Sequence, residues 1–140
     1  MAVAAALDGA DPLAEARKSA ATEQLRARLD RALALRDRNH DPTPGAVADA
    51  LGNSSAGHES VPAALYAATQ GQDFEQAVSF AVACGGDADT IGAMTGAVAG
   101  ARFGAEAIPV RWLKALEDGE RGRTHVERLA ERLHCSWSRS

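Results

Sequence analysis

Apolar residues recur every three or four positions along most of this chain, which is the spacing of one face of an α-helix. Leu25, Leu29 and Leu33 follow one another at intervals of four, downstream of an Asp-Pro pair that is a favoured helix start. We therefore expect one amphipathic helix over residues 11–38, ended by the Pro- and Gly-rich residues 39–45. Its other faces are charged, which is typical of a solvated surface, although a partner surface is the alternative.

The rest of the chain carries the same helical pattern in shorter stretches. Apolar spacing, proline positions and capping patterns predict further helices that begin near Ala46, Ser60, Asp73, Trp112 and Val126. Asp73 is followed three positions later by Gln76, which is the pattern of a capping box. No strand-like alternation and no internal repeat is visible, so the pattern predicts an all-α protein.

One predicted helix is built largely from small residues. Gly92, Gly96, Gly100 and Gly104 recur every four positions on one side. Each glycine inside a helix costs roughly 1 kcal/mol relative to alanine. We expect a neighbouring helix to pack closely against this smooth side, which would make the glycine-rich helix central and buried.

Composition narrows the class of protein. The 140 residues are 46% hydrophobic but only 4% aromatic, and the formal net charge of −4 argues against a nucleic-acid-binding module. The two cysteines, Cys84 and Cys135, form neither a disulfide framework nor a metal-binding knuckle. No signal peptide and no apolar stretch of roughly 20 residues is visible, so we expect no membrane association and a cytoplasmic location.

Residues 85–90, Gly-Gly-Asp-Ala-Asp-Thr, hold the densest candidate chemistry. The two glycines permit a sharp turn with positive φ. Asp87, Asp89 and Thr90 then present two carboxylates and a hydroxyl, the oxygen ligands that Mg²⁺ prefers. The alternative is that Asp89 or Thr90 caps the next helix. Neighbouring carboxylates raise each other's pKa unless a cation offsets them, which favours the metal.

A second candidate is the small-residue loop over residues 51–57. Loops of this kind let backbone N–H groups approach a phosphate or a ribose, but an ordinary turn has the same composition. Glu59, just beyond it, either contacts a ligand or compensates the dipole of the following helix.

Two blocks of sequence resemble a known family. Residues 85–101 are similar to the C-terminal metal motif of the ADP-ribosylglycohydrolase family. Leu51-Gly52-Asn53, together with residues 59–66, resembles the ADP-ribosylhydrolase-3 branch, which hydrolyses serine-linked and polymeric ADP-ribose. Both blocks occur in the family's order and together cover roughly residues 45–110.

The resemblance implies a fold, an activity and a set of site residues. The fold is a compact orthogonal helical bundle, and the activity is Mg²⁺-dependent removal of ADP-ribose from ADP-ribosylated proteins or poly-ADP-ribose. The implied Mg²⁺ ligands are Asp87, Asp89 and Thr90. The implied substrate-binding residues are Gly52, Asn53, Ser54, Ser55, Glu59, Gly85 and Gly86. Ser55 departs from the apolar residue usual in the branch, and the catalytic acid or base is unknown.

The resemblance also implies that part of the enzyme lies outside these residues. Family members are about twice this length, above the usual size of one domain. Their N-terminal half supplies a Thr-Asp-Asp metal motif, which residues 1–44 lack. Residues 1–140 then correspond to the C-terminal portion, with the motifs in a core over 45–110 and a frayed tail over 135–140. An N-terminal half or self-association is an implied partner. The alternatives are an incomplete ADP-ribose-binding half and a helical protein in which Asp87 and Asp89 are caps.

Overall fold

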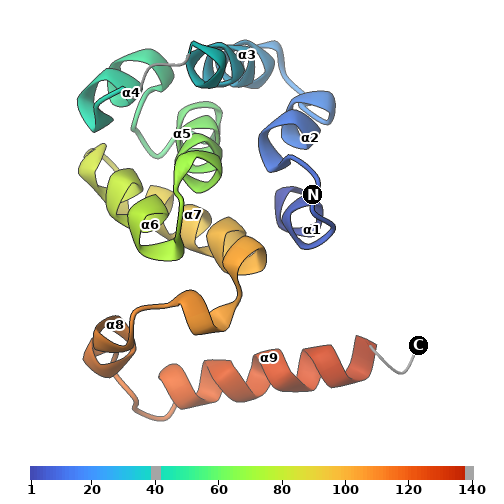
Figure 1. The fold of residues 1–140 in the computed structure, drawn as a ribbon, viewed down its shortest axis with the longest axis vertical. Coiled ribbons are helices and arrows are strands. Elements are labelled where there is room, and N and C mark those ends of the chain that lie inside the picture. Colours follow the sequence, from blue (N-terminus) through green and yellow to red (C-terminus); the bar gives the residue numbers. More distant parts are fainter. Residues whose placement is uncertain (39–41, 138–140) are drawn as a thin grey trace. The chain divides into compact units, whose positions relative to one another are not determined.

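The computed structural model describes residues 1–38 and 42–137. The chain divides into two compact units, Met1–Ala107 and Ile108–Ser140 (Figure 1). Within the described residues every regular element is helical, which confirms the predicted all-α class. In the same residues, no helix is both long enough and apolar enough to cross a membrane.

The first unit is built around one buried helix. Its elements are α1 (Ala2–Leu7), α2 (Pro12–Lys18), α3 (Glu23–Asp37), α4 (Pro44–Leu51), α5 (Gly57–Gln70), α6 (Phe74–Ala83), α7 (Ala88–Phe103) and the short 3-10 helix η1 (Ala105–Ala107). Helix α5 buries every residue from Pro62 to Ala68, and α3, α6 and α7 all pack against it (Figure 1). The most deeply buried helix is therefore α5, whereas the sequence pointed to the glycine-rich α7.

The core of this unit draws on most of its helices. Its largest fully buried apolar side chains come from α2, α3, α4, α5 and α7: Leu13, Leu29, Leu51, Tyr66 and Ile91. Each such side chain contributes about 1.5–3 kcal/mol by leaving water. The core thus includes the segment over residues 11–38 as well as the predicted core over 45–110.

The prediction of a single helix over residues 11–38 is wrong. Two helices, α2 and α3, replace it, because the Thr22 side chain provides a second helix start. Its hydroxyl accepts a hydrogen bond from the Leu25 N–H at 3.2 Å, which favours a cap over continued helix. Arg26 then donates to the Ala20 carbonyl at 3.0 Å and satisfies a backbone group in the break.

The glycine side of α7 packs against α6, as predicted. A Cβ at Gly92 would lie 3.3 Å from a methyl of Val82, and one at Gly96 would lie 3.9 Å from the Phe74 ring. Gly104 has a different role from the one predicted: with a φ of +85° it ends α7 rather than lining its packing face. A Cβ would therefore be crowded at Gly92 but in ordinary van der Waals contact at Gly96, so the contact between α6 and α7 is closest at Gly92.

The second unit holds α8 (Val110–Ala115) and α9 (Arg123–Trp137). Asp118, in the connection between them, accepts hydrogen bonds at 2.7 Å from the N–H and the hydroxyl of Thr124, and these bonds hold its pKa below the usual range. The tail predicted to fray over residues 135–140 is helical as far as 137, and the remaining three positions lie outside the described residues.

Helix α9 carries an apolar stripe that stays exposed. Its members are Val126, Leu129 and Leu133, with exposed fractions of 60%, 49% and 67%. Such a stripe is compatible with the predicted self-association, which stays a prediction.

Candidate functional site

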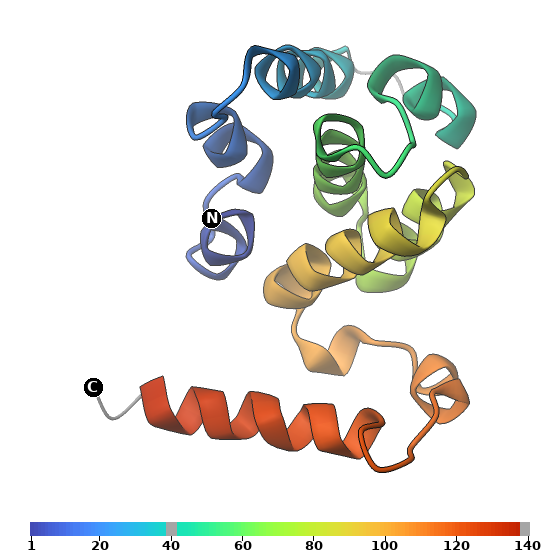
Figure 2. The same cartoon turned by 180° about the vertical axis from the view of Figure 1, so that it is seen from behind.

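Two loops that are distant in sequence meet at one end of the first unit (Figure 2). One joins α4 to α5 and the other joins α6 to α7. The Asn53 side chain donates to the Cys84 carbonyl at 2.9 Å, and the Asp87 N–H donates to the Asn53 carbonyl at 2.8 Å. Asn53 therefore fastens the two predicted motifs together, although 31 positions separate it from Cys84.

Two glycines make this close approach possible. Gly86 has a φ of +64°, and a Cβ there would overlap the Asn53 carbonyl oxygen. Gly52 has a φ of +82°, and a Cβ there would overlap the carboxylate of Glu59. Gly85 also has a positive φ, of +69°, but a Cβ there would make only an ordinary contact, 3.9 Å from the Asn53 side-chain nitrogen. Gly52 and Gly86 are thus required both by conformation and by contact.

Asp87 stands at the N-cap position of α7 but does not cap the helix. Its side chain accepts no hydrogen bond from the first turn, and its Oδ2 is the single buried side-chain polar atom without a partner among the described residues. Buried polar atoms normally have partners, so such an atom requires an explanation. The capping alternative for Asp89 or Thr90 is wrong, because both residues lie inside the helix, in its first turn.

The two remaining members of the motif lie on the exposed side of that turn. Asp89 accepts a hydrogen bond from the Thr90 N–H at 3.0 Å. A hydrogen bond with the Asp87 carboxyl group, followed by the backbone N–H groups of Thr90 and Asp89, holds the pKa of Asp89 below its usual range. Asp89 therefore does not show the raised pKa that the sequence predicted for neighbouring carboxylates. The structure thus brings Asp87, Asp89 and Thr90 to one helix turn. Among residues 1–38 and 42–137, no three His, Cys, Asp or Glu side chains gather closely enough to hold a metal by themselves.

Glu59 braces the first loop from the beginning of α5. Its Oε2 accepts from the Ser54 hydroxyl at 2.7 Å and the Ser54 N–H at 3.3 Å, and its Oε1 lies 3.4 Å from an Arg28 nitrogen. The two bonds from Ser54, followed by the charges of Arg28 and His58, hold the pKa of Glu59 below its usual range. Glu59 therefore fixes the loop as an ionised group. Ser55 is exposed and lies within the loop that Glu59 braces.

The local start of α5 differs from the one predicted. The helix begins at Gly57 rather than at Ser60, and Ser60 is buried inside it, donating to the Ala56 carbonyl at 3.3 Å. Helices α5 and α7 both begin directly after the two loops, so their N-terminal turns lie beside them. Free backbone N–H groups and the positive ends of two helix dipoles therefore gather at this point, which favours an anionic ligand.

Sequence reasoning missed Arg28. It reaches Glu59 from α3, 31 positions away, and no local pattern marks that contact. In the sequence it is one of several charged residues on an amphipathic helix, and only the packing of α3 on α5 distinguishes it.

Fold and site together define an all-α protein with an acidic motif at a helix start. The chain matches the sequence model of the ADP-ribosylglycohydrolase family over residues 1–139, and it belongs to that family. This result confirms the family predicted from the two motifs.

Individual relatives place the chain more narrowly. It is 31% identical over 105 residues to ADP-ribosylhydrolase ARH3 of Homo sapiens, a match that covers 67% of this chain and 28% of the relative. It is 45% identical over 84 residues to an uncharacterized protein of Archaeoglobus fulgidus (60% and 26%). It is 37% identical over 75 residues to ADP-ribosylarginine hydrolase Tri1 of Serratia proteamaculans (54% and 19%). The similarity to ARH3 confirms the predicted branch, and the chain spans less than a third of the length of these relatives.

Proposed function

We propose that this chain forms part of a hydrolase that removes ADP-ribose from ADP-ribosylated proteins or from poly-ADP-ribose. The observation that carries the proposal is the buried Asp87 oxygen without a hydrogen-bond partner, beside Asp89 and at the meeting point of two helix starts. The names of two relatives, ADP-ribosylhydrolase ARH3 and ADP-ribosylarginine hydrolase Tri1, support the choice of ADP-ribose as the group released.

Mg²⁺ fits the residues that the structure brings together. A buried carboxylate oxygen without a donor costs roughly 1–3 kcal/mol or more, and a cation would offset that cost. Asp87, Asp89 and Thr90 offer the hard oxygen atoms that Mg²⁺ prefers. Bound there, Mg²⁺ would supply Lewis-acid polarisation and would orient the hydroxyls of the distal ribose.

The chain's own residues then act mainly on the position of the substrate. Glu59 and Asn53 hold the loop in place, and the N–H groups of Ser54 and Ala56 are bonded within it. The pyrophosphate of ADP-ribose would therefore bind at the N-terminal turns of α5 and α7, where the helix dipoles favour an anion. Water attacks the anomeric carbon through an oxocarbenium-like transition state, as in other glycoside hydrolyses. We assign no general acid or base to this chain.

A second candidate function is an ADP-ribose-binding half that needs a partner for turnover. The observation that favours it is the small number of possible metal ligands at the site. In the described part of the chain, no third His, Cys, Asp or Glu side chain joins Asp87 and Asp89. A segment with the Thr-Asp-Asp motif would complete the ligand set. Hydrolysis of ADP-ribosyl-serine by the 140-residue chain alone contradicts this alternative, whereas activity that appears only on mixing with such a segment supports it.

The experiment for the proposed function is a calorimetric titration of Mg²⁺, and then ADP-ribose, into the whole chain and into Asp87→Asn. We expect Mg²⁺ binding that the variant loses, because the amide cannot replace the charge of the half-buried carboxylate. Asp8→Asn is the matched control, since Asp8 is exposed and at the end of α1, and it should bind as the wild type does. Equal Mg²⁺ affinity in all three proteins would contradict the assigned metal site.

A further inference from the structure

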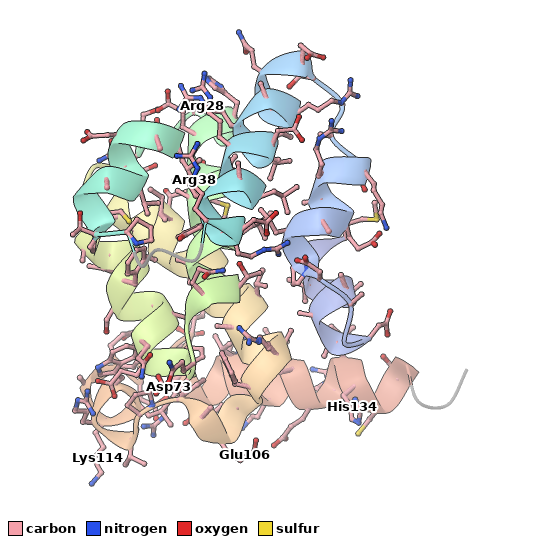
Figure 3. All side chains as sticks on the ribbon, turned by 45° about the horizontal axis from the view of Figure 1, so that its top comes forward. Arg28, Arg38, Asp73, Glu106, Lys114 and His134 are labelled. Carbon is pink, nitrogen blue, oxygen red and sulfur yellow. The ribbon has the colours of Figure 1, made fainter. Side chains whose placement is uncertain are left out.

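The charged residues of α3 are sorted onto separate sides of the helix. Arg28 and Arg31 in the helix, and Arg38 at its C-cap, follow one another at spacings of three and seven, which places them along one side. Figure 3 shows Arg28 and Arg38 on the side of α3 that faces α4. The acidic residues recur every seven positions along another side: Glu23, Asp30 and Asp37. We call the first set the arginine row of α3.

Arginines outside this row neutralise the acidic residues. The pairs and their nitrogen–oxygen distances are Arg17–Asp30 at 2.5 Å, Arg26–Glu23 at 3.4 Å and Arg36–Asp37 at 3.6 Å. By contrast, the side chains of Arg31 and Arg38 make no hydrogen bond or ion pair with any residue of the described part of the chain, and both are exposed. Among the described residues, nothing neutralises these two positive charges, in a chain whose net charge is −4.

These two arginines line a groove between α3 and α4. The groove has a volume of about 310 Å³, and its walls are Arg31, Ala34, Leu35, Arg38, Asp49 and Ala50. Seven residues separate the two arginines, which is about 10 Å along a helix. Asp49 lines the groove from α4 and adds one carboxylate to its walls. The groove thus offers two anion-binding groups and one acceptor for hydroxyl groups.

The arginine row begins at the candidate site. Arg28 lies 3.4 Å from Glu59, and Glu59 in turn holds Ser54 in the loop that faces the metal motif. The charge of Arg28 is therefore used to hold the loop through Glu59, whereas Arg31 and Arg38 follow it along the same side of α3. The groove that these two arginines line also includes Asp49 and Ala50 near the end of α4, which leads into this loop.

We infer that the groove lined by Arg31 and Arg38 binds the pyrophosphate of the neighbouring unit when the ligand is an ADP-ribose polymer. This inference rests on the proposed function. It implies that the chain holds a polymer at two points, the first site and the groove, whereas it holds a single ADP-ribose on a protein at the first site alone. Guanidinium groups bind phosphate oxygens in pairs. Asp49 accepts ribose hydroxyls and repels a bare run of phosphates, so the groove selects a sugar-phosphate.

The test compares free ADP-ribose with an ADP-ribose oligomer of defined length, by fluorescence anisotropy over a range of salt concentrations. The whole chain is compared with the double variant Arg31→Gln/Arg38→Gln. Arg128→Gln/Arg132→Gln is the matched control, because it removes two exposed arginines from α9 and changes the net charge equally. Glutamine and arginine have similar helix propensities, so both variants should fold.

We expect the oligomer to bind the wild type and the control with equal affinity. It should bind the groove variant about tenfold more weakly at low salt. The slope of the logarithm of the binding constant against the logarithm of the salt concentration should also be reduced in this variant, by roughly 0.7 for each phosphate that is no longer neutralised. Free ADP-ribose should bind all three proteins equally. Equal oligomer affinity in the groove variant and the control would overturn the inference. Equal competition by single-stranded DNA of the same charge would also overturn it, since DNA lacks the 2′-hydroxyl.

Failure of the inference and failure of the proposed function are distinguishable. If free ADP-ribose binds and the groove variant binds oligomer normally, the inference fails and the proposed function stands. If the oligomer depends on Arg31 and Arg38 while free ADP-ribose binds none of the proteins, the groove stands and the first site fails.

Discussion

Glu59 acts within the candidate site through its neighbours. Both of its carboxylate oxygens are occupied: Oε2 by the hydroxyl and N–H of Ser54, and Oε1 by Arg28. Because Gly52 leaves no room for a side chain beside that carboxylate, the loop and the carboxylate fit against each other directly. The position of Ser54 therefore depends on the charge of Glu59.

This dependence predicts a pH effect. The folded chain holds the pKa of Glu59 below its usual value of 4.5, so Glu59 contributes stability that is present above that value and is lost as the pH falls through the lower folded pKa. The unfolding free energy of the wild type should therefore fall more steeply than that of Glu59→Gln between about pH 5 and pH 3. Urea denaturation at a series of pH values measures this difference. Glu120→Gln, an exposed position in the second unit, should keep the steep fall of the wild type; parallel curves for the wild type and Glu59→Gln would contradict the prediction.

At the residue scale, the sequence predicted a set of side chains that the structure brings together, but it did not predict the contacts between them. The residue types at Asp87, Asp89 and Thr90 indicated hard-oxygen ligands, and the structure brings them to one helix turn. The bond from Asn53 to the Cys84 carbonyl spans 31 positions and has no local pattern. Likewise, Arg28 is marked only by the packing of its helix.

At the scale of helices, the position of the metal motif depends on how α7 is held. Its glycine side lies against α6, and on the other side the Thr95 hydroxyl donates to the Ile91 carbonyl at 2.8 Å and the Ala64 carbonyl of α5 at 3.3 Å. Helix α7 is thus fixed between two neighbours. The positions of Asp87 and Asp89, at the beginning of α7, are therefore fixed by the same packing.

A large side chain on the glycine side should therefore displace α6. Gly96→Leu would place its side chain against Phe74 and Val78, whose nearest atoms are 3.9 Å from the position of a Cβ. We expect it to destabilise the chain by about 1–3 kcal/mol, the usual effect of overpacking. Ala93→Leu, on the exposed side of the same helix, should change the unfolding free energy by no more than about 0.5 kcal/mol. Chemical denaturation measures both, and equal stability of the two variants would contradict close packing between α6 and α7.

Helix existence was easier to predict than helix limits. The spacing of Leu25, Leu29 and Leu33 identified α3 correctly, and Asp73 caps α6 through the Gln76 N–H at 2.7 Å as the capping box predicted. The break before α3 escaped prediction because alanines on either side continue the helical pattern. There the Thr22 hydroxyl starts a new helix by accepting a hydrogen bond from the Leu25 N–H. That bond is seen in the structure but cannot be read from the apolar spacing of the sequence.

At the scale of the whole molecule, the buried core is confined to the first unit. Among the described residues, every buried member of the main apolar cluster lies between Leu13 and Val98, and none comes from α8 or α9. The chain covers less than a third of its relatives, yet residues 1–107 bury a continuous core of their own. The buried core and the candidate site therefore lie in the same unit.

This confinement predicts that residues 1–107 fold without the remainder. The shortened chain should unfold cooperatively, with a free energy within about 1 kcal/mol of the full chain, because it keeps all members of the core cluster. Its Mg²⁺ response should also persist, since both loops of the site lie within it. Circular dichroism during thermal unfolding, with and without Mg²⁺, measures both properties. The matched control is a chain cut after Asp87, which loses Ile91, Thr95 and Val98 and should not fold; loss of folding in both shortened chains would show that the second unit is part of the folding unit.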